Sequence, residues 1–322
     1  MSSKNLKEIA DKARKNDFIS ISELMTGIET RVFSRKEVSQ IIFKESHKSL
    51  KIGITGPPGA GKSSLMNKLI PLIRKENLSV GVIAIDPSSP ITGGSFLGDR
   101  VRINNAVNDD NVFVRSMGSR AELGGVTELA EDFSDILAFS GKDIIFIETV
   151  GVGQSEIVAS NLVDIFTLIV GPGSGDELQG IKKGITEYAD IFIVNKNDGE
   201  LKMEASKTAA DYKSALSYYK KLDELEKQVL LVSSIEQTGM EDVIKTINQI
   251  IDQNKLKGIF DERRADQLEY WIEEEVKNII ASDITNRLTS KGNIPKYSEK
   301  VMRNEMSMYE AVETITKDTL KQ

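Results

Sequence analysis

The sequence predicts an α/β fold with a mainly parallel β-sheet flanked by helices, with further helices at both ends of the chain. Residues 47–252 alternate short apolar runs, typical of strands, with stretches of helical spacing. Several of these runs are continuous in Val, Ile, Leu and Phe, which is typical of parallel strands buried on both faces. Residues 1–46 and 253–322 show helical patterns instead, so we predict an N-terminal helical segment and a C-terminal helical arm.

The N-terminal segment is predicted to form two or three helices. Its apolar residues recur at helical spacing in two groups, Ile21, Leu24, Met25 and Ile28, then Val38, Ile41 and Ile42. Ser34 and Glu37 have the spacing of a capping box, which marks the start of a helix. We expect these helices to pack against the main domain rather than to form a separate binding module.

Seven apolar runs in the central region are the strand candidates. They are residues 50–55, 80–85, 111–115, 143–148, 164–170, 190–194 and 228–233. Parallel strands place all their carboxyl ends at one edge of the sheet, where ligands of such folds bind. Each polar motif described below follows one of these strands, so the motifs are expected to meet at that edge.

The segment Gly56-Pro57-Pro58-Gly59-Ala60-Gly61-Lys62-Ser63 matches the pattern G-x-x-x-x-G-K-[ST] between a strand and a helical pattern. Glycines let the backbone approach a phosphate closely, and the loop N–H groups and the helix N-terminus then point at the anion. Lys62 can reach the β- and γ-phosphates, and Ser63 offers a hydroxyl to Mg²⁺. The sequence therefore predicts a phosphate-binding P-loop. Its predicted binding residues are Gly56, Gly59, Ala60, Gly61, Lys62, Ser63 and Ser64.

The segment Asn195-Lys196-Asn197-Asp198 follows another predicted strand and matches N-K-x-D, which reads guanine in GTPases. The carboxylate of Asp198 can accept hydrogens from both N1–H and the exocyclic amine of guanine. Adenine offers no such pair and would leave the carboxylate desolvated and unpaired. We expect Asn195 to brace neighbouring loops and Lys196 to pack on the base. The segment Val232-Ser233-Ser234 is expected to supply backbone N–H groups to the guanine carbonyl, with Ser233 as the binding candidate. This motif predicts GTP and GDP, rather than ATP, as ligands.

Three carboxylates are candidates for binding Mg²⁺ together with Ser63. Glu148 begins Glu148-Thr149-Val150-Gly151, in the place where many GTPases carry D-x-x-G, and Gly151 is expected to meet the γ-phosphate with its backbone N–H. Asp86 and Asp99 lie in a glycine-rich stretch after the second strand. Turn formation is the alternative role for Asp86, and a general-base role for Glu148 stays open.

Residues 171–184 are rich in glycine and charge and follow the fifth strand. They suit a switch that turns toward the nucleotide. A flexible connection into a helix is the alternative.

Composition excludes several classes of function. With 42 Lys and Arg against 49 Asp and Glu, the net charge is -7, which argues against nucleic acid as a partner. The chain has no Cys and one histidine, His47, so a His/Cys transition-metal site is excluded. The N-terminus lacks the apolar core of a secretory signal, and no apolar run approaches a membrane span. We expect a cytoplasmic protein with no membrane partner.

The C-terminal arm is predicted to contain apolar stripes. One stripe consists of Leu268, Trp271, Ile272, Val276, Ile279 and Ile280. A loop from Ser290 to Pro295 precedes a last helix from about 297 to 320, with one side formed by Val301, Met308, Ala311 and Ile315. Such stripes either fold back or pair with another subunit, and we favour a homodimer.

Five segments in this order, GPPGAGKSS, AIDPSSPITGGSFLGDRVR, ETVGVGQSE, GDELQGIKKGI and NKND, resemble the MeaB/ArgK family of GTPases over roughly residues 20–320. The resemblance implies a GTP-hydrolysing chaperone of adenosylcobalamin-dependent acyl-CoA mutases, above all methylmalonyl-CoA mutase. Such a chaperone gates loading of the cofactor and protects the mutase. It also implies a homodimer joined through the C-terminal arm and slow hydrolysis that the mutase raises.

The resemblance also implies roles for individual residues. Asp86 and Asp99 would belong to a Mg²⁺-linked first switch and Glu148 to a second. Asp176, Gln179 and Lys182 would form a third switch that turns toward the nucleotide when the mutase binds. Lys182 would then place positive charge on the transferring phosphate. The catalytic candidates are therefore Glu148, Asp176 and Lys182.

Three other functions are weighed against this one. The older ArgK label implies an ATP-using kinase linked to transport, and Asp198 argues against it. A nickel-inserting GTPase needs His and Cys ligands that this chain lacks. A nucleotide-gated structural or transport-linked module would bind its partners alike in the GTP and GDP states.

Overall fold

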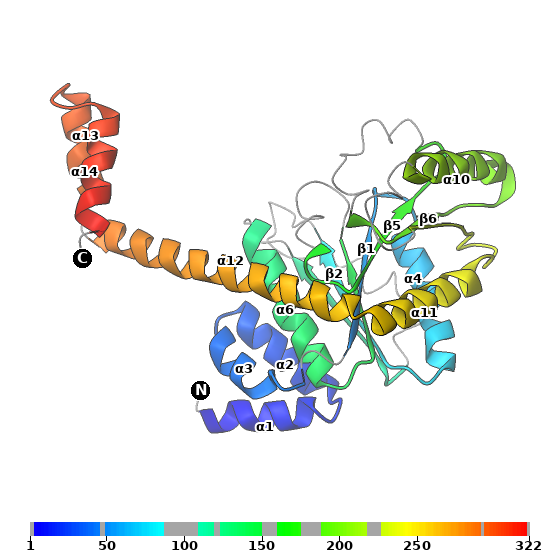
Figure 1. Cartoon of the computed structure of the whole chain (residues 1–322). Helices are drawn as coiled ribbons and strands as arrows, with labels where there is room; N and C mark the ends of the chain where they lie inside the picture. The colour runs from blue at the N-terminus through cyan, green and yellow to red at the C-terminus, as the bar shows by residue number, and fades with distance from the viewer. Residues whose placement is uncertain are drawn as a thin grey trace. The chain divides into compact units, whose positions relative to one another are not determined.

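The computed structural model describes residues 3–45, 49–86, 109–118, 123–149, 160–174, 188–217, 227–290 and 293–320. The chain divides into two compact units, residues 1–260 and 261–322, and each is described by itself. Figure 1 shows their helices and strands.

The first unit is built on a seven-stranded sheet with the order β3-β2-β4-β1-β5-β6-β7, in which every pairing is parallel. The strands are β1 (Leu50–Thr55), β2 (Val80–Asp86), β3 (Val112–Gly118), β4 (Ile144–Glu148), β5 (Ile165–Val170), β6 (Ile191–Val194) and β7 (Gln228–Leu231). This confirms the predicted α/β class. The last strand ends at Leu231 rather than at 233, because Ser233 leaves the sheet and bridges to Thr238.

Helices cover both faces of the sheet. Helices α4 (Lys62–Lys75) and α11 (Met240–Lys257) share one core cluster with alternate strand residues such as Val80 and Val82. The residue between them, Gly81, faces the opposite way, toward Leu137 of α6 (Leu123–Phe139). Helix α10 (Lys202–Ser217) lies on the α6 side, where its Tyr212 packs on Phe192 with ring centroids 5.7 Å apart.

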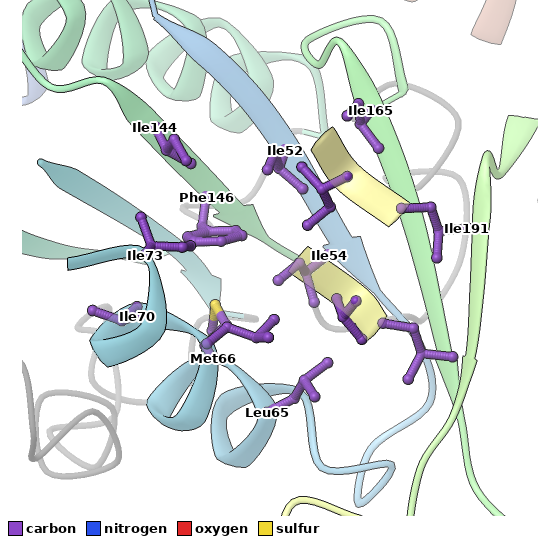
Figure 2. Packing of buried hydrophobic residues seen from close by; sticks show 14 of the residues in the cluster. Ile52, Ile54, Leu65, Met66, Ile70, Ile73, Ile144, Phe146, Ile165 and Ile191 are labelled. Carbon is purple, nitrogen blue, oxygen red and sulfur yellow. The ribbon is translucent and has the colours of Figure 1, made fainter. Parts of the chain in front are cut away.

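The core beneath α4 positions the loop that joins it to β1. Figure 2 shows Ile52 and Ile54 of β1 packed with Leu65 and Met66 of α4 and with Phe146 of β4. All five side chains are at most 2% exposed. Packing of this density holds the helix in one position on the strand, so the residues between Thr55 and α4 have two fixed ends.

Three aspartates just before strands complete the amino edge of the sheet. Asp143 accepts the backbone N–H of Ser79 at 2.7 Å. Asp164 and Asp190 accept the N–H groups of Lys51 and Phe166, each at 2.8 Å. Carboxylates thus satisfy backbone donors at the edge, where the ladder leaves groups unpaired.

The N-terminal helices α1 (Ser3–Ala13), α2 (Phe18–Glu29) and α3 (Arg35–Ile42) pack on the main domain, on α6 and β3. Phe18 meets Phe113 edge to face, with ring centroids 5.2 Å apart. Arg35 pairs with two carboxylates of α6, those of Glu128 at 2.9 Å and Asp132 at 2.5 Å. The expected start of a helix at Ser34 is confirmed, since its N–H donates to Glu37 at 3.4 Å.

The charged face of α6 contains one carboxyl whose pKa is strongly shifted. Burial, and secondarily the neighbouring Asp135, raise the pKa of Glu131 to about 7. The unfolded chain ionises this group near its ordinary value of 4.5, so between these two pKa values the folded chain binds more protons. The free energy of unfolding therefore falls as pH rises from 4.5 to 7.

We expect Glu131→Gln to remove the free-energy cost of ionising this buried carboxyl. At pH 8 the variant should be more stable than the wild type by about 1–3 kcal/mol, and at pH 4 the two should be alike. Chemical denaturation at both pH values measures the difference. Glu23→Gln, an exposed change on α2, serves as the control. Equal stabilities of the wild type and Glu131→Gln at pH 8 would contradict the raised pKa.

The second unit is helical. It consists of α12 (Ile259–Ser290), which begins two residues before the unit does, followed by α13 (Asn293–Met302) and α14 (Met308–Leu320). The predicted single helix over 297–320 is wrong. Asn304 adopts a left-handed φ of 56°, which ends α13, and α14 begins at a new cap. In this cap the N–H of Ser307 donates to Glu310 at 2.7 Å, and Glu310 N–H donates to the Ser307 hydroxyl at 3.2 Å. The predicted loop at 290–295 is also shorter, because α13 starts at Asn293.

The apolar stripe of α12 is exposed. Five of its six members are 49–61% exposed, and they are Leu268, Ile272, Val276, Ile279 and Ile280. The sixth, Trp271, is partly buried. None of the helices in the described ranges combines the length and the apolarity needed to cross a membrane.

Candidate nucleotide-binding site

The P-loop, residues 56–63, leaves the carboxyl end of β1 at the centre of the sheet. Strand β1 lies between β4 and β5. The chain that follows β1 forms β2, β3 and β4 on one side of it, and β5, β6 and β7 all lie on the other. Such a switch in strand order opens a crevice at the carboxyl edge, where ligands of α/β sheets bind. The topology therefore places this loop where a ligand is expected.

Two glycines of the P-loop are required by both conformation and space. Gly56 and Gly61 have φ values of 146° and 94°. A Cβ on Gly56 would lie 1.9 Å from the carbonyl oxygen of Ile169, and one on Gly61 would lie 2.3 Å from Nδ2 of Asn195. The loop is therefore in tight contact with β5 and with the N-K-x-D segment. Any larger residue at these positions would displace one of them.

The lysine of the motif is buried within its own loop. Lys62 is 8% exposed, and its Nζ donates to the carbonyl oxygens of Gly56 at 2.8 Å and Pro57 at 3.2 Å. These bonds place a cation beside the N-terminus of α4, whose first turn also contains the exposed Ser64. A positive charge and a helix N-terminus together favour a phosphate group.

Glu148 and Ser63 form the candidate metal-binding pair. Glu148 ends β4 opposite Ile54 of β1. The hydroxyl of Ser63 donates to its carboxylate, at 3.0 Å to Oε1 and 3.4 Å to Oε2. Hydroxyl and carboxylate oxygens side by side are the hard ligands that Mg²⁺ prefers. The residues present thus fit a Mg²⁺ that would accompany the nucleotide and neutralise phosphate charge.

Asn195 connects the three loops of the site. It is 1% exposed, and its Nδ2 donates to the carbonyl oxygen of Ala60 in the P-loop at 3.0 Å. Its Oδ1 accepts from the backbone N–H groups of Lys196 at 2.8 Å and Ser234 at 3.1 Å, and from the Ser234 hydroxyl at 3.0 Å. One amide therefore holds the P-loop, the N-K-x-D segment and the turn after β7 in register.

Asp198 is oriented by a serine from the next loop. The Ser233 hydroxyl donates to Oδ2 of Asp198 and accepts the backbone N–H of Glu236 at 3.0 Å. The backbone N–H of Ser233 donates to Thr238 at 3.1 Å. The sequence predicts that this N–H binds the guanine carbonyl, but here it is already used within the turn. Ser233 contributes to the site through its side chain instead.

Several predicted site residues lie outside the described residues. They are Asp99, Gly151, Asp176, Gln179 and Lys182, together with the side chain of Asp86. In the parts of the chain that are described, no cluster of three or more acidic or histidine side chains suited to a metal occurs.

Sequence reasoning gave Ser234 another role and missed two further residues that the fold brings to this site. Ser234 was expected to offer its backbone N–H to guanine, but this N–H and the hydroxyl both donate to Asn195. Thr55 and Thr149 form a buried hydrogen bond at the base of the P-loop. They are 94 residues apart, and no local pattern connects them.

A P-loop at the switch point of a parallel sheet, joined by an asparagine to a carboxylate that can read guanine, defines a P-loop GTPase. The chain belongs to the family described as methylmalonyl Co-A mutase-associated GTPase MeaB, whose profile matches residues 21–291. It is accordingly a GTP hydrolase.

Relatives match nearly the whole chain. A protein of Pyrococcus abyssi named as a GTPase is 36% identical over 97% of this chain and 96% of its own length. The mitochondrial methylmalonic aciduria type A homolog of Mus musculus is 30% identical over 92% of this chain and 75% of its own length. A crystal structure titled LAO/AO transport system kinase superposes with a TM-score of 0.75 at 25% identity and covers 98% of both chains.

Proposed function

We propose that this chain is a Mg²⁺-dependent GTPase that acts as a chaperone of an adenosylcobalamin-dependent acyl-CoA mutase, with methylmalonyl-CoA mutase as the first candidate. It would gate loading of the cofactor and protect the mutase. The observation that carries the proposal is the family match over residues 21–291, since the family is described by its association with this mutase. The name of the mouse relative, which refers to methylmalonic aciduria, supports the same partner.

The proposed mechanism assigns roles to residues of this chain. Lys62 and the P-loop N–H groups bind the phosphates, and Asp198 reads the base. Ser63 and Glu148, whose Oγ and Oε1 atoms are 3.0 Å apart, would hold Mg²⁺ together with Asp86 and Asp99. Phosphoryl transfer is catalysed mainly by such positioning and charge.

The remaining roles belong to Gly151 and to three residues of the segment after β5. Gly151 would meet the γ-phosphate with its backbone N–H. Asp176, Gln179 and Lys182 would respond to the mutase, and Lys182 would stabilise the transferring phosphate.

The test is steady-state GTP hydrolysis by the purified chain, alone and with methylmalonyl-CoA mutase. We expect slow turnover that the mutase raises severalfold or more, because a cation turned toward the transferring phosphate stabilises its charge. ATP should not be turned over. Lys182→Ala should leave GDP binding intact and abolish the stimulation. Hydrolysis that is indifferent to the mutase would refute this partner and leave the GTPase intact.

A second candidate is a transport-linked kinase, because the solved structure with a TM-score of 0.75 carries that title. Its chemistry requires phosphate transfer from ATP to an acceptor other than water. The same assay separates the two functions, since the kinase needs ATP and Asp198 would leave adenine without a partner for its carboxylate.

We also propose that two copies of the chain pair through the exposed stripe of α12, and that the protein acts in the cytoplasm. Five apolar side chains, each about half exposed, favour burial against a second copy. The molar mass in solution tests this, because Ile272→Glu should convert a dimer into monomers while GTP hydrolysis persists. A wild-type chain that is already monomeric would refute the pairing.

A further inference from the structure

Two consecutive residues, Glu148 at the end of β4 and Thr149 directly after it, contact both ends of the P-loop. Thr55 directly precedes the loop, and its hydroxyl accepts a hydrogen bond from the Thr149 hydroxyl at 2.9 Å. Ser63 closes the loop, and its hydroxyl donates to Glu148 at 3.0 Å. The backbone N–H of Thr149 adds a bond to the carbonyl oxygen of Ile54 at 2.9 Å. The loop that binds phosphate and the carboxylate proposed to bind metal are thereby joined.

The threonine pair is in the interior. Thr55 is 0% exposed and Thr149 is 2% exposed. A buried hydroxyl without a hydrogen-bond partner is unfavourable, because it has lost its bonds to water and gained none in return. Breaking the bond between the two threonines would leave both hydroxyls in this state, so the bond is expected to persist. Threonine is also stiff about χ1, because two heavy atoms branch from Cβ. The bond is therefore a fixed link and not one of several exchangeable contacts with water.

The second bond from Thr149 matters for geometry. The parallel ladders hold β4 between β1 and β2 as far as Glu148, and Thr149 is the first residue beyond them. Its hydroxyl bond to Thr55 therefore fixes the chain directly after Glu148, where the ladders end. We expect this link to set how the Glu148 carboxylate lies relative to Ser63 and the loop.

We propose that Thr149, through its hydrogen bond to Thr55, is a positioning residue for GTP hydrolysis that fixes the Glu148 carboxylate against the P-loop. Thr149 touches neither the nucleotide nor the metal in this role. Its effect passes through Glu148, so the inference rests on the metal-binding role proposed above for that residue. Displacement of a catalytic group by about 1 Å slows a reaction by up to about 100-fold.

The test compares Thr149→Val with Thr149→Ser in the full chain. In Thr149→Val, kcat for GTP should fall by about tenfold, and the Mg²⁺ concentration for half-maximal rate should rise. GDP affinity should stay within about twofold, because the P-loop itself is intact. Thr149→Ser keeps the hydroxyl and should restore both kcat and the Mg²⁺ requirement. Thr167→Val, a buried threonine of the neighbouring β5, is the matched control and should behave as the wild type.

Thr55→Val removes the same bond from the other side and serves if Thr149→Val does not fold. The double variant should lose no more activity than either single variant, since both act through one bond. The proposal is overturned if Thr149→Val keeps the kcat and Mg²⁺ requirement of the wild type. It is equally overturned if Thr149→Ser is as slow as Thr149→Val, or if the loss of activity only follows the fraction of unfolded chain.

Glu148→Gln separates this proposal from the one it rests on. Full hydrolysis by Glu148→Gln would refute the metal-binding role of the carboxylate itself. Slow hydrolysis by Glu148→Gln, with normal hydrolysis by Thr149→Val, would refute only the positioning role of Thr149.

Discussion

Lys62→Ala should abolish GTP hydrolysis, with a loss in kcat/KM of about 10³-fold or more. The ammonium of Lys62 lies among the carbonyl oxygens of the P-loop and is 8% exposed. It is therefore a charge held in place before the reaction, in an environment that strengthens its interaction with phosphate. Alanine removes that charge together with its hydrogen bonds to the carbonyl oxygens of Gly56 and Pro57. Initial-rate kinetics over a range of GTP concentrations measure the loss.

Two further variants test whether the loss is specific to Lys62 and whether a positive charge alone is enough. Lys75→Ala removes an exposed lysine from the last turn of the same helix and should leave the rate unchanged. Lys62→Arg keeps the charge, but its planar guanidinium does not replace a compact ammonium bonded to two loop carbonyls. It should therefore be nearly as slow as Lys62→Ala. Wild-type turnover by Lys62→Ala would mean that the P-loop does not bind the reacting phosphate.

Asp198→Asn should change which base the site accepts. We expect GDP affinity to fall by about 100-fold, because a buried hydrogen-bonding group left without its partner costs about 1–3 kcal/mol. The affinity for xanthosine diphosphate should rise. The carboxylate only accepts hydrogen bonds, whereas an amide also donates, and xanthine replaces the exocyclic amine of guanine with a carbonyl oxygen. Competition of GDP, XDP and ADP against a fluorescent GDP analogue measures the three affinities.

The structure makes this variant a clean test. Asp198 is held by the Ser233 hydroxyl, which both donates and accepts, so the serine can bond to an amide as well as to a carboxylate. The loop should therefore keep its position in Asp198→Asn. Glu200→Gln, an exposed change two residues away, controls for loss of local charge and should not alter base preference. Unchanged GDP affinity in Asp198→Asn would remove the guanine assignment.

Features that depend on neighbouring residues were predicted well. Continuous apolar runs predicted all seven strands, because burial on both faces demands them. The P-loop and the N-K-x-D segment were recognised because their chemistry needs particular residues at fixed spacing. The break between α13 and α14 was not predicted, although it is also local. Ser307 and Glu310 have the same capping spacing as Ser34 and Glu37, but apolar periodicity continues across the break and hides it.

Contacts between segments far apart in the sequence could not be predicted from local patterns. Asn195 bonds to Ala60 across 135 positions, and Thr149 bonds to Thr55 across 94. Neither pair has a spacing rule, because the distance between two residues on different strands depends on strand order and register. The use of the Ser233 backbone N–H was misjudged for the same reason, since its acceptor, Thr238, is set by the turn after β7.

The sequence by itself therefore determined the fold class, the phosphate-binding loop and the choice of guanine, since each is a property of adjacent residues. Only the tertiary structure decided how these parts are joined. The order of strands put β4 beside β1, and this adjacency brought Glu148 to Ser63 and Thr149 to Thr55. Side chains from different strands meet only when the backbone ladder fixes their register, and that register belongs to the folded sheet as a whole.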